Sequence, residues 1–169
     1  MSPDPMVPVK VGVIGIGNMG WHHARVLSLL RDADLVGVAD PDAERGKLAT
    51  EQFGCRWFAD YNAMLSEVEA VCIAVPTLLH HPVGLACLRA GVHVLIEKPI
   101  AASQDEATAL IEAASAAGCL LQVGHIERFN PAFRVSSPRW WPTKRWWFLR
   151  RVATAPTPIG PMTSLWCWI

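Results

Sequence analysis

The chain has 169 residues, of which 51% are hydrophobic and 18% charged, a balance typical of a globular domain with a sizeable core. Fifteen basic residues offset fifteen acidic ones, so no overall charge attracts nucleic acid or an anionic membrane, and we expect neither as a partner. The N-terminus lacks a secretory pattern, no stretch approaches the ~18 apolar residues of a membrane span, and the five cysteines lack metal-site spacing, so we expect a cytoplasmic chain with reduced thiols and no bound metal.

Strands and helices are predicted to alternate from residue 10 to residue 123. Short runs of β-branched and other apolar residues predict six strands, at 10–14, 35–39, 55–58, 70–75, 92–96 and 119–123. Apolar residues at helical spacing predict the helices between them, at 18–30, 41–53, 61–67, 81–90 and 104–117. Pro41 is predicted to begin the second helix, and Ser103 with Glu106 to cap the last one. This alternation predicts an α/β fold, a doubly wound parallel sheet with helices on both faces.

A glycine-rich loop joins the first predicted strand to the first helix and fits the pattern G-x-G-x-x-G. In a dinucleotide-binding loop the first glycine makes the turn, the second lets the backbone approach a pyrophosphate, and the third lets the helix pack closely. Free N–H groups at the helix start then face the phosphates. The loop therefore predicts a Rossmann fold that binds NAD or NADP through Gly15, Gly17, Asn18, Met19 and Gly20; ordinary tight-turn glycines are the alternative.

Asp40 ends the second predicted strand, twenty residues after the last glycine of the loop. An acid at this place can bind the adenosine ribose hydroxyls, and its charge would repel a 2′-phosphate. It therefore favours NAD over NADP, whereas Arg45 on the following helix favours NADP. Capping of the helix predicted to begin at Pro41 is a second role that Asp40 can have from its position.

Two charged residues, Glu97 and Lys98, lie at the carboxyl end of a predicted buried strand and precede Pro99. Burying charge is unfavourable unless a partner or a ligand compensates for it. These residues are therefore candidates for a functional site, and a surface turn ended by the proline is the alternative.

The glycine loop, Asp40, residues 74–77 with His80, and the sequence Glu97-Lys98-Pro99 together resemble the Gfo/Idh/MocA oxidoreductases. The resemblance covers residues 9–134, which we expect to form a dinucleotide-binding domain. It implies an NAD(P)-dependent oxidoreductase that transfers hydride at a hydroxyl of a sugar or nucleotide sugar.

The resemblance also assigns roles to residues. It implies that Lys98 lies near the nicotinamide and the substrate and assists proton transfer, and that Pro76, Thr77, His80 and Glu97 belong to the cofactor site. His80 and its neighbour His81 are further candidates as proton carriers, with a structural or solvated histidine as the alternative. A dinucleotide-binding module that senses or scaffolds without turnover is the alternative function, and a homo-oligomer is left open.

Residues 122–131 resemble more narrowly the branch that oxidises UDP-N-acetylglucosamine at its 3-hydroxyl. In this stretch His125 is a candidate proton carrier, and Arg128 a candidate ligand for a nucleotide-sugar phosphate. A structural or solvated histidine and a surface ion pair between Arg128 and Glu127 are the alternatives.

The composition changes after residue 135. Residues 136–169 hold five basic residues, no acidic ones, five prolines and six of the eight tryptophans. We interpret 135–169 as an irregular tail, typical of a frameshift, with an interfacial membrane segment and a single-stranded nucleic-acid binder as alternatives. The resemblance implies a further α/β substrate domain with a histidine and a nearby aspartate, and we expect residues 135–169 to hold no counterpart of it. The chain by itself is therefore expected to bind cofactor with little or no turnover.

Overall fold

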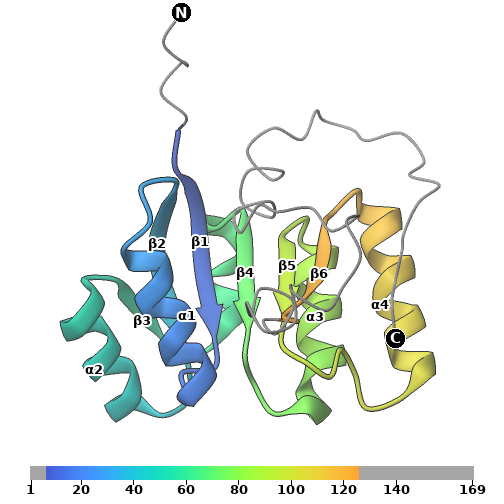
Figure 1. The fold of residues 1–169 in the computed structure, drawn as a ribbon, viewed down its shortest axis with the longest axis horizontal. Coiled ribbons are helices and arrows are strands. Elements are labelled where there is room, and N and C mark those ends of the chain that lie inside the picture. The colour runs from blue at the N-terminus through green and yellow to red at the C-terminus, as the bar shows by residue number, and fades with distance from the viewer. Residues whose placement is uncertain (1–6, 126–169) are drawn as a thin grey trace, which may run out of the picture.

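A six-stranded parallel sheet forms the centre of the computed structural model, which describes residues 7–125 (Figure 1). Its strands are β1 (Val9–Ile14), β2 (Ala33–Ala39), β3 (Arg56–Phe58), β4 (Ala70–Ile73), β5 (His93–Ile96) and β6 (Leu121–Val123). Their order across the sheet is β3-β2-β1-β4-β5-β6, and every pairing is parallel. The predicted doubly wound sheet is confirmed. Arg128 and the predicted tail at 135–169 lie outside the described residues.

In the described part of the chain, four α-helices connect the strands: α1 (Asn18–Ser28), α2 (Ala43–Phe53), α3 (His80–Arg89) and α4 (Gln104–Ala117). Three short 3₁₀ helices complete the connections: η1 (Tyr61–Ala63), η2 (Leu65–Glu67) and η3 (Thr77–Leu79). Within residues 7–125, no helix combines the length and the apolar character needed to cross a bilayer.

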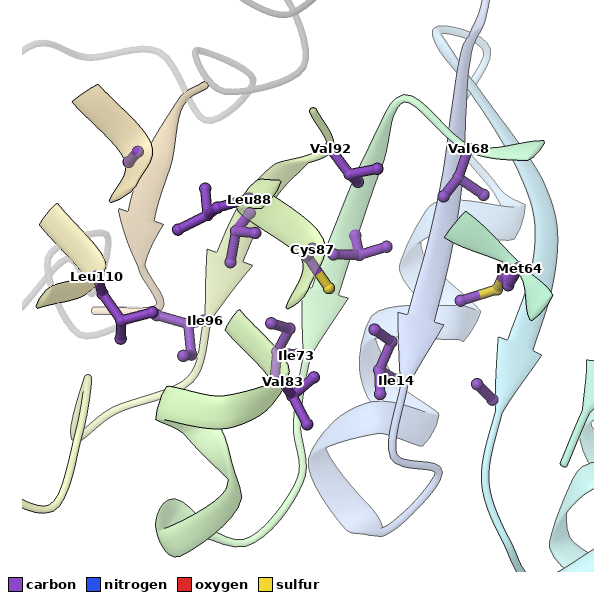
Figure 2. Close-up of a cluster of buried hydrophobic side chains, with 14 residues drawn as sticks. Ile14, Met64, Val68, Ile73, Val83, Cys87, Leu88, Val92, Ile96 and Leu110 are labelled. Atoms are coloured by element: carbon purple, nitrogen blue, oxygen red, sulfur yellow. The ribbon is translucent and has the colours of Figure 1, made fainter. Parts of the chain in front are cut away.

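Buried side chains form two cores, one on each face of the sheet. Successive strand residues point to opposite faces, so Ala70 and Cys72 of β4 pack with α1 and α2, whereas Val71 and Ile73 pack with α3 and α4. Figure 2 shows the second core, in which side chains of the sheet meet those of the covering helices: Ile14, Ile73, Ile96, Val83, Cys87, Leu88 and Leu110. This packing holds the helices on both faces against the sheet. It therefore also fixes the loops that join the strands to the helices.

Two predicted helices differ in the structure. The second begins at Ala43 instead of Pro41, because the carboxylate of Asp42 accepts the N–H groups of Glu44 and Arg45 at 3.0 and 3.2 Å. Asp40 is therefore not the cap of this helix. The segment 61–67, predicted as one helix, forms the two short 3₁₀ helices η1 and η2 instead.

The His93 side chain connects β5 to the residue before β6, where the N–H of Leu120 donates to its Nδ1 at 2.9 Å. This contact requires a ring without a proton on Nδ1. Burial lowers the pKa of His93 below its ordinary value of 6.5, while Glu69 opposes the shift. Because the pKa of His93 is lower in the folded chain than in the unfolded chain, the unfolded chain binds this proton more tightly. The contribution of His93 to stability is therefore complete above its ordinary pKa of 6.5 and is lost as the pH falls through the lowered pKa.

We expect His93→Gln to reduce the acid-induced loss of stability, because a glutamine side-chain oxygen accepts the same N–H without titrating. Urea unfolding at about pH 7.5 and about pH 5.5 measures the free energy of unfolding on both sides of the histidine titration. His22→Gln, at an exposed histidine, is the control and should lose as much stability in acid as the wild type. The same acid loss in His93→Gln as in the wild type would contradict the expectation.

Candidate functional site

The predicted site residues that the structure describes lie at the carboxyl edge of the sheet. Because all strands are parallel, the loops that follow them meet at this one edge (Figure 1). Chain order reverses between β1 and β4, which makes their shared end a switch point, the place where open α/β sheets bind ligands. The structure thus brings the glycine loop, Asp40, residues 76–77, Glu97 and Lys98 to one edge.

The glycine loop packs tightly on one side and is open on the other. Gly15 has φ +88°, a conformation that favours glycine, and its N–H donates to the carbonyl of Ala39 at 2.8 Å. A Cβ on Gly20 would lie only 1.7 Å from the Gly15 carbonyl oxygen, so α1 rests directly on the loop backbone. A Cβ on Gly17 would meet nothing within 4 Å. Space for a ligand therefore exists above Gly17.

The start of α1 is suited to an anion. Its N-cap residue is Gly17, which makes no side-chain cap, and no acidic residue lies in its first turn. The first N–H groups of a helix lack intrahelical partners, and the helix dipole places partial positive charge there. Asn18 and Met19 are exposed in this first turn. A pyrophosphate fits this arrangement, because it would supply the acceptors and the negative charge.

Asp40 is buried, with 6% of its surface exposed, and supports the glycine loop. Its Oδ2 accepts the N–H of Ile16 at 2.7 Å, and its Oδ1 accepts that of Asp42 at 2.9 Å. A carboxylate can accept about four hydrogen bonds, so two partners leave acceptor capacity for ribose hydroxyls. Sequence reasoning missed this supporting role, because Ile16 lies 24 residues away.

Arg45 lies beside Asp40 but pairs with Asp42. Its Nε is 2.9 Å from Asp42 Oδ2, and its guanidinium is 4.0 Å from Asp40 Oδ2. The hydrogen bond from its backbone N–H, followed by its guanidinium, holds the pKa of Asp42 below the ordinary value. Among the described residues, Arg45 is the only cation that the structure places at Asp40, and it is already paired with the carboxylate of Asp42.

Glu97 points into the protein. It is 6% exposed, its Oε1 lies 2.8 Å from Nε2 of His23 on α1, and its Oε2 accepts the N–H of Lys98 at 3.1 Å. Burial, and secondarily the charge of Glu97, raises the pKa of Cys72 to about 12, so this thiol stays protonated. The Lys98 side chain is exposed at the sheet edge. Sequence reasoning did not find His23, which is 74 residues from its partner.

His80 is almost fully enclosed, with 2% of its surface exposed. Its Nδ1 lies 2.8 Å from the carbonyl oxygen of Pro99, and its Nε2 lies 2.9 Å from that of Val75. Carbonyl oxygens only accept, so the ring donates to both when each nitrogen carries a hydrogen. Both nitrogens are therefore engaged with the backbone, and neither faces solvent as a free proton carrier.

The remaining predicted residues differ in how the structure places them. Pro76 is exposed and Thr77 is half-buried at the start of η3. They closely follow Ala74, which packs against the glycine loop, since a Cβ on Gly15 would lie 2.9 Å from the carbonyl oxygen of Ala74. His125 is exposed just past β6. In the part of the chain that the structure describes, no cluster of three or more His, Cys, Asp or Glu residues could hold a metal ion.

Comparisons with known proteins agree with this geometry. Residues 9–125 match the sequence model described as "Oxidoreductase family, NAD-binding Rossmann fold". The UDP-N-acetylglucosamine 3-dehydrogenase of Acidithiobacillus ferrooxidans is 40% identical over 129 residues, which are 76% of this chain and 41% of that protein. An inositol 2-dehydrogenase of Rubrobacter xylanophilus is 42% identical over 127 residues, 73% of this chain and 37% of that protein. This chain therefore spans about two fifths of the length of these relatives.

Solved structures give the same result. The Acidithiobacillus ferrooxidans UDP-N-acetylglucosamine 3-dehydrogenase superposes with a TM-score of 0.73, covering 78% of this chain and 43% of the other. GenD2 from gentamicin A biosynthesis, solved in complex with NAD, is 33% identical with a TM-score of 0.75, covering 80% of this chain and 40% of its own. A 3-ketoreductase from Actinomadura kijaniata, solved with TDP-benzene and NADP, is 31% identical with a TM-score of 0.73, covering 77% of this chain and 42% of its own.

Proposed function

The chain belongs to the Gfo/Idh/MocA oxidoreductases, whose NAD-binding Rossmann domain it contains, and we propose that it binds NAD and takes part in hydride transfer at a hydroxyl of a sugar or nucleotide sugar. The observation that carries the proposal is the start of α1, which is free of a side-chain cap and open above Gly17. Residues 9–134 are proposed as the cofactor-binding domain.

The proposed cofactor contacts follow the edge of the sheet. Gly15, Gly17, Asn18, Met19 and Gly20 would hold the pyrophosphate, and Asp40 the adenosine ribose. Residues 76–77 and Lys98 would line the nicotinamide half of the cofactor. His80 and Glu97 would support the cofactor site indirectly, because their polar atoms are already engaged in the protein. His80 contacts backbone carbonyl oxygens, and Glu97 contacts His23 and the N–H of Lys98.

The proposed chemistry is the interconversion of a secondary alcohol and a ketone. NAD, held by the glycine loop and Asp40, would supply the hydride acceptor, and the hydroxyl proton would leave to a base, so that alcohol and NAD⁺ would give ketone, NADH and a proton. A neutral amine at Lys98 Nζ would accept that proton, and the same group, once protonated, would donate it in the reverse direction. Relatives named for UDP-N-acetylglucosamine and for inositols support a cyclic polyol or a nucleotide sugar as the substrate class. His125 and Arg128 remain proposed substrate contacts.

We expect Asp40→Ala to weaken NAD binding by roughly 10- to 100-fold, since a hydrogen bond to a charged group contributes about 1.5–3 kcal/mol. NADP should be weakened less, because the lost carboxylate also repelled the 2′-phosphate. Isothermal titration calorimetry with both cofactors measures this difference. Asp34→Ala, which removes an exposed acid near the start of β2, is the control for the loss of a carboxylate away from the site.

Three outcomes would count against the proposal. Equal NAD affinity of wild type and Asp40→Ala would remove Asp40 from the site. No NAD binding by the wild type would overturn the proposed function, whereas NAD binding without turnover of any sugar, even in a chimera that supplies the rest of a relative's chain, would favour the non-catalytic module.

A further inference from the structure

The two residues on either side of Lys98 are each held by a histidine from a different helix. On one side, the carboxylate of Glu97 contacts Nε2 of His23, which belongs to α1, at 2.8 Å. On the other side, the carbonyl oxygen of Pro99 contacts Nδ1 of His80, the first residue of α3, at 2.8 Å. Lys98 itself is joined to the first of these contacts, because its N–H donates to Glu97 Oε2 at 3.1 Å.

Both histidines are also attached to walls of the proposed cofactor site. His23 lies on α1, whose first turn follows Gly17. The second nitrogen of His80, Nε2, lies 2.9 Å from the carbonyl oxygen of Val75, next to the backbone of Ala74 that packs on the glycine turn. The turn that carries Lys98 is thus connected through His23 to the helix that follows the glycine loop, and through His80 to the loop after β4.

The surroundings leave these groups little freedom. Glu97 and His80 are 6% and 2% exposed, and the loss of a hydrogen-bond partner is unfavourable for a buried polar group. A Cβ on Gly124 would lie 3.0 Å from Glu97 Oε1, so the carboxylate is also packed against the end of β6. The contacts span 74 and 19 residues and therefore form only in the folded chain. The backbone of Lys98 is held at both ends, and its side chain stays exposed.

We propose that His23 and His80 are positioning residues that clamp the turn 97–99 and thereby set the place of Lys98 beside the bound cofactor. The inference rests on the proposed function, since it assumes NAD at this edge. It predicts that removing either imidazole displaces Lys98 in a protein that still folds and binds NAD. A misplacement of about 1 Å can lower a rate by roughly 10²-fold, so such a clamp matters for proton transfer.

The test observes Lys98 directly in the full chain. Lysines are reductively methylated with ¹³C-formaldehyde, which keeps their charge, and the Lys98 methyl signal is assigned by its absence in Lys98→Arg. Spectra are compared without NAD and at saturating NAD, so that the shift reports position and not occupancy. We expect NAD to shift the Lys98 signal in the wild type, and His23→Ala and His80→Ala to lose more than half of that shift. His23→Gln, which retains an N–H donor for Glu97, should recover it.

Controls separate positioning from general stability. His22→Ala removes an exposed imidazole from the same helix and should keep the full shift, and Lys47, exposed on α2, serves as the reference lysine in every sample. If His80→Ala fails to fold, the test rests on His23→Ala and His23→Gln, because His23 is only half-buried. A full Lys98 shift in NAD-saturated His23→Ala overturns the inference but leaves the proposed function standing. Absence of calorimetric NAD binding in the wild type overturns the proposed function and the inference with it.

Discussion

Gly20→Ala is expected to destabilise the chain by about 3 kcal/mol, at the upper end of ordinary overpacking costs, and to abolish NAD binding. A Cβ at this position lies 1.7 Å from the carbonyl oxygen of Gly15 and 2.8 Å from its carbonyl carbon. Both are backbone atoms, so no side-chain rotation can make room. Helix α1 would have to move away from the loop, which would disturb the packing of its buried residues Ala24 and Leu27. Urea unfolding and calorimetry measure the two effects.

Gly17→Ala is the matched control, because its Cβ would meet nothing within 4 Å and its φ of −76° suits alanine. Its stability should change by less than about 1 kcal/mol, the usual scale of a cap substitution. Its NAD affinity should nevertheless fall, since the methyl group takes up space that we assign to the pyrophosphate. A Gly20→Ala variant as stable as the wild type would contradict the close packing of α1, and normal NAD binding by Gly17→Ala would place the pyrophosphate elsewhere.

Much of the fold could be predicted because its signals are local. The six strands are short and mostly apolar, and the cap of α4 needs only Ser103, whose Oγ accepts the N–H of Glu106 at 3.2 Å. The start of α2 could not be predicted in this way. Asp40 and Asp42 are both capping residues by type, and the choice depends on Ile16, a residue distant in sequence that engages Asp40.

The site was predictable in location but not in its internal contacts. Parallel strands bring their carboxyl ends together, so the glycine loop, Asp40 and Lys98 were expected at one edge. The contact of His23 with Glu97 joins α1 to the end of β5, and no periodicity relates residues so far apart. A weak signal existed, because His23 lies three residues after Gly20 and therefore on the same face of α1.

Lys98→Ala is expected to lower turnover by about 10²- to 10⁴-fold, far more than it weakens NAD binding, because general acid–base groups contribute on that scale. The Lys98 side chain is exposed, and its backbone contact with Glu97 does not depend on atoms beyond Cβ. Its removal should therefore leave the turn in place and take away only the group that exchanges the proton.

Turnover can be measured in a chimera in which residues 9–125 replace the matching part of the Acidithiobacillus ferrooxidans relative, assayed for NADH formation with UDP-N-acetylglucosamine. Lys47→Ala, at an exposed lysine of α2, is the control and should keep full turnover. Lys98→Arg separates charge from proton transfer, because a guanidinium stays protonated in proteins and cannot act as the base. We expect it to be as slow as Lys98→Ala. Full turnover in Lys98→Arg would mean that positive charge alone suffices at this position, and full turnover in Lys98→Ala would exclude Lys98 from the chemistry.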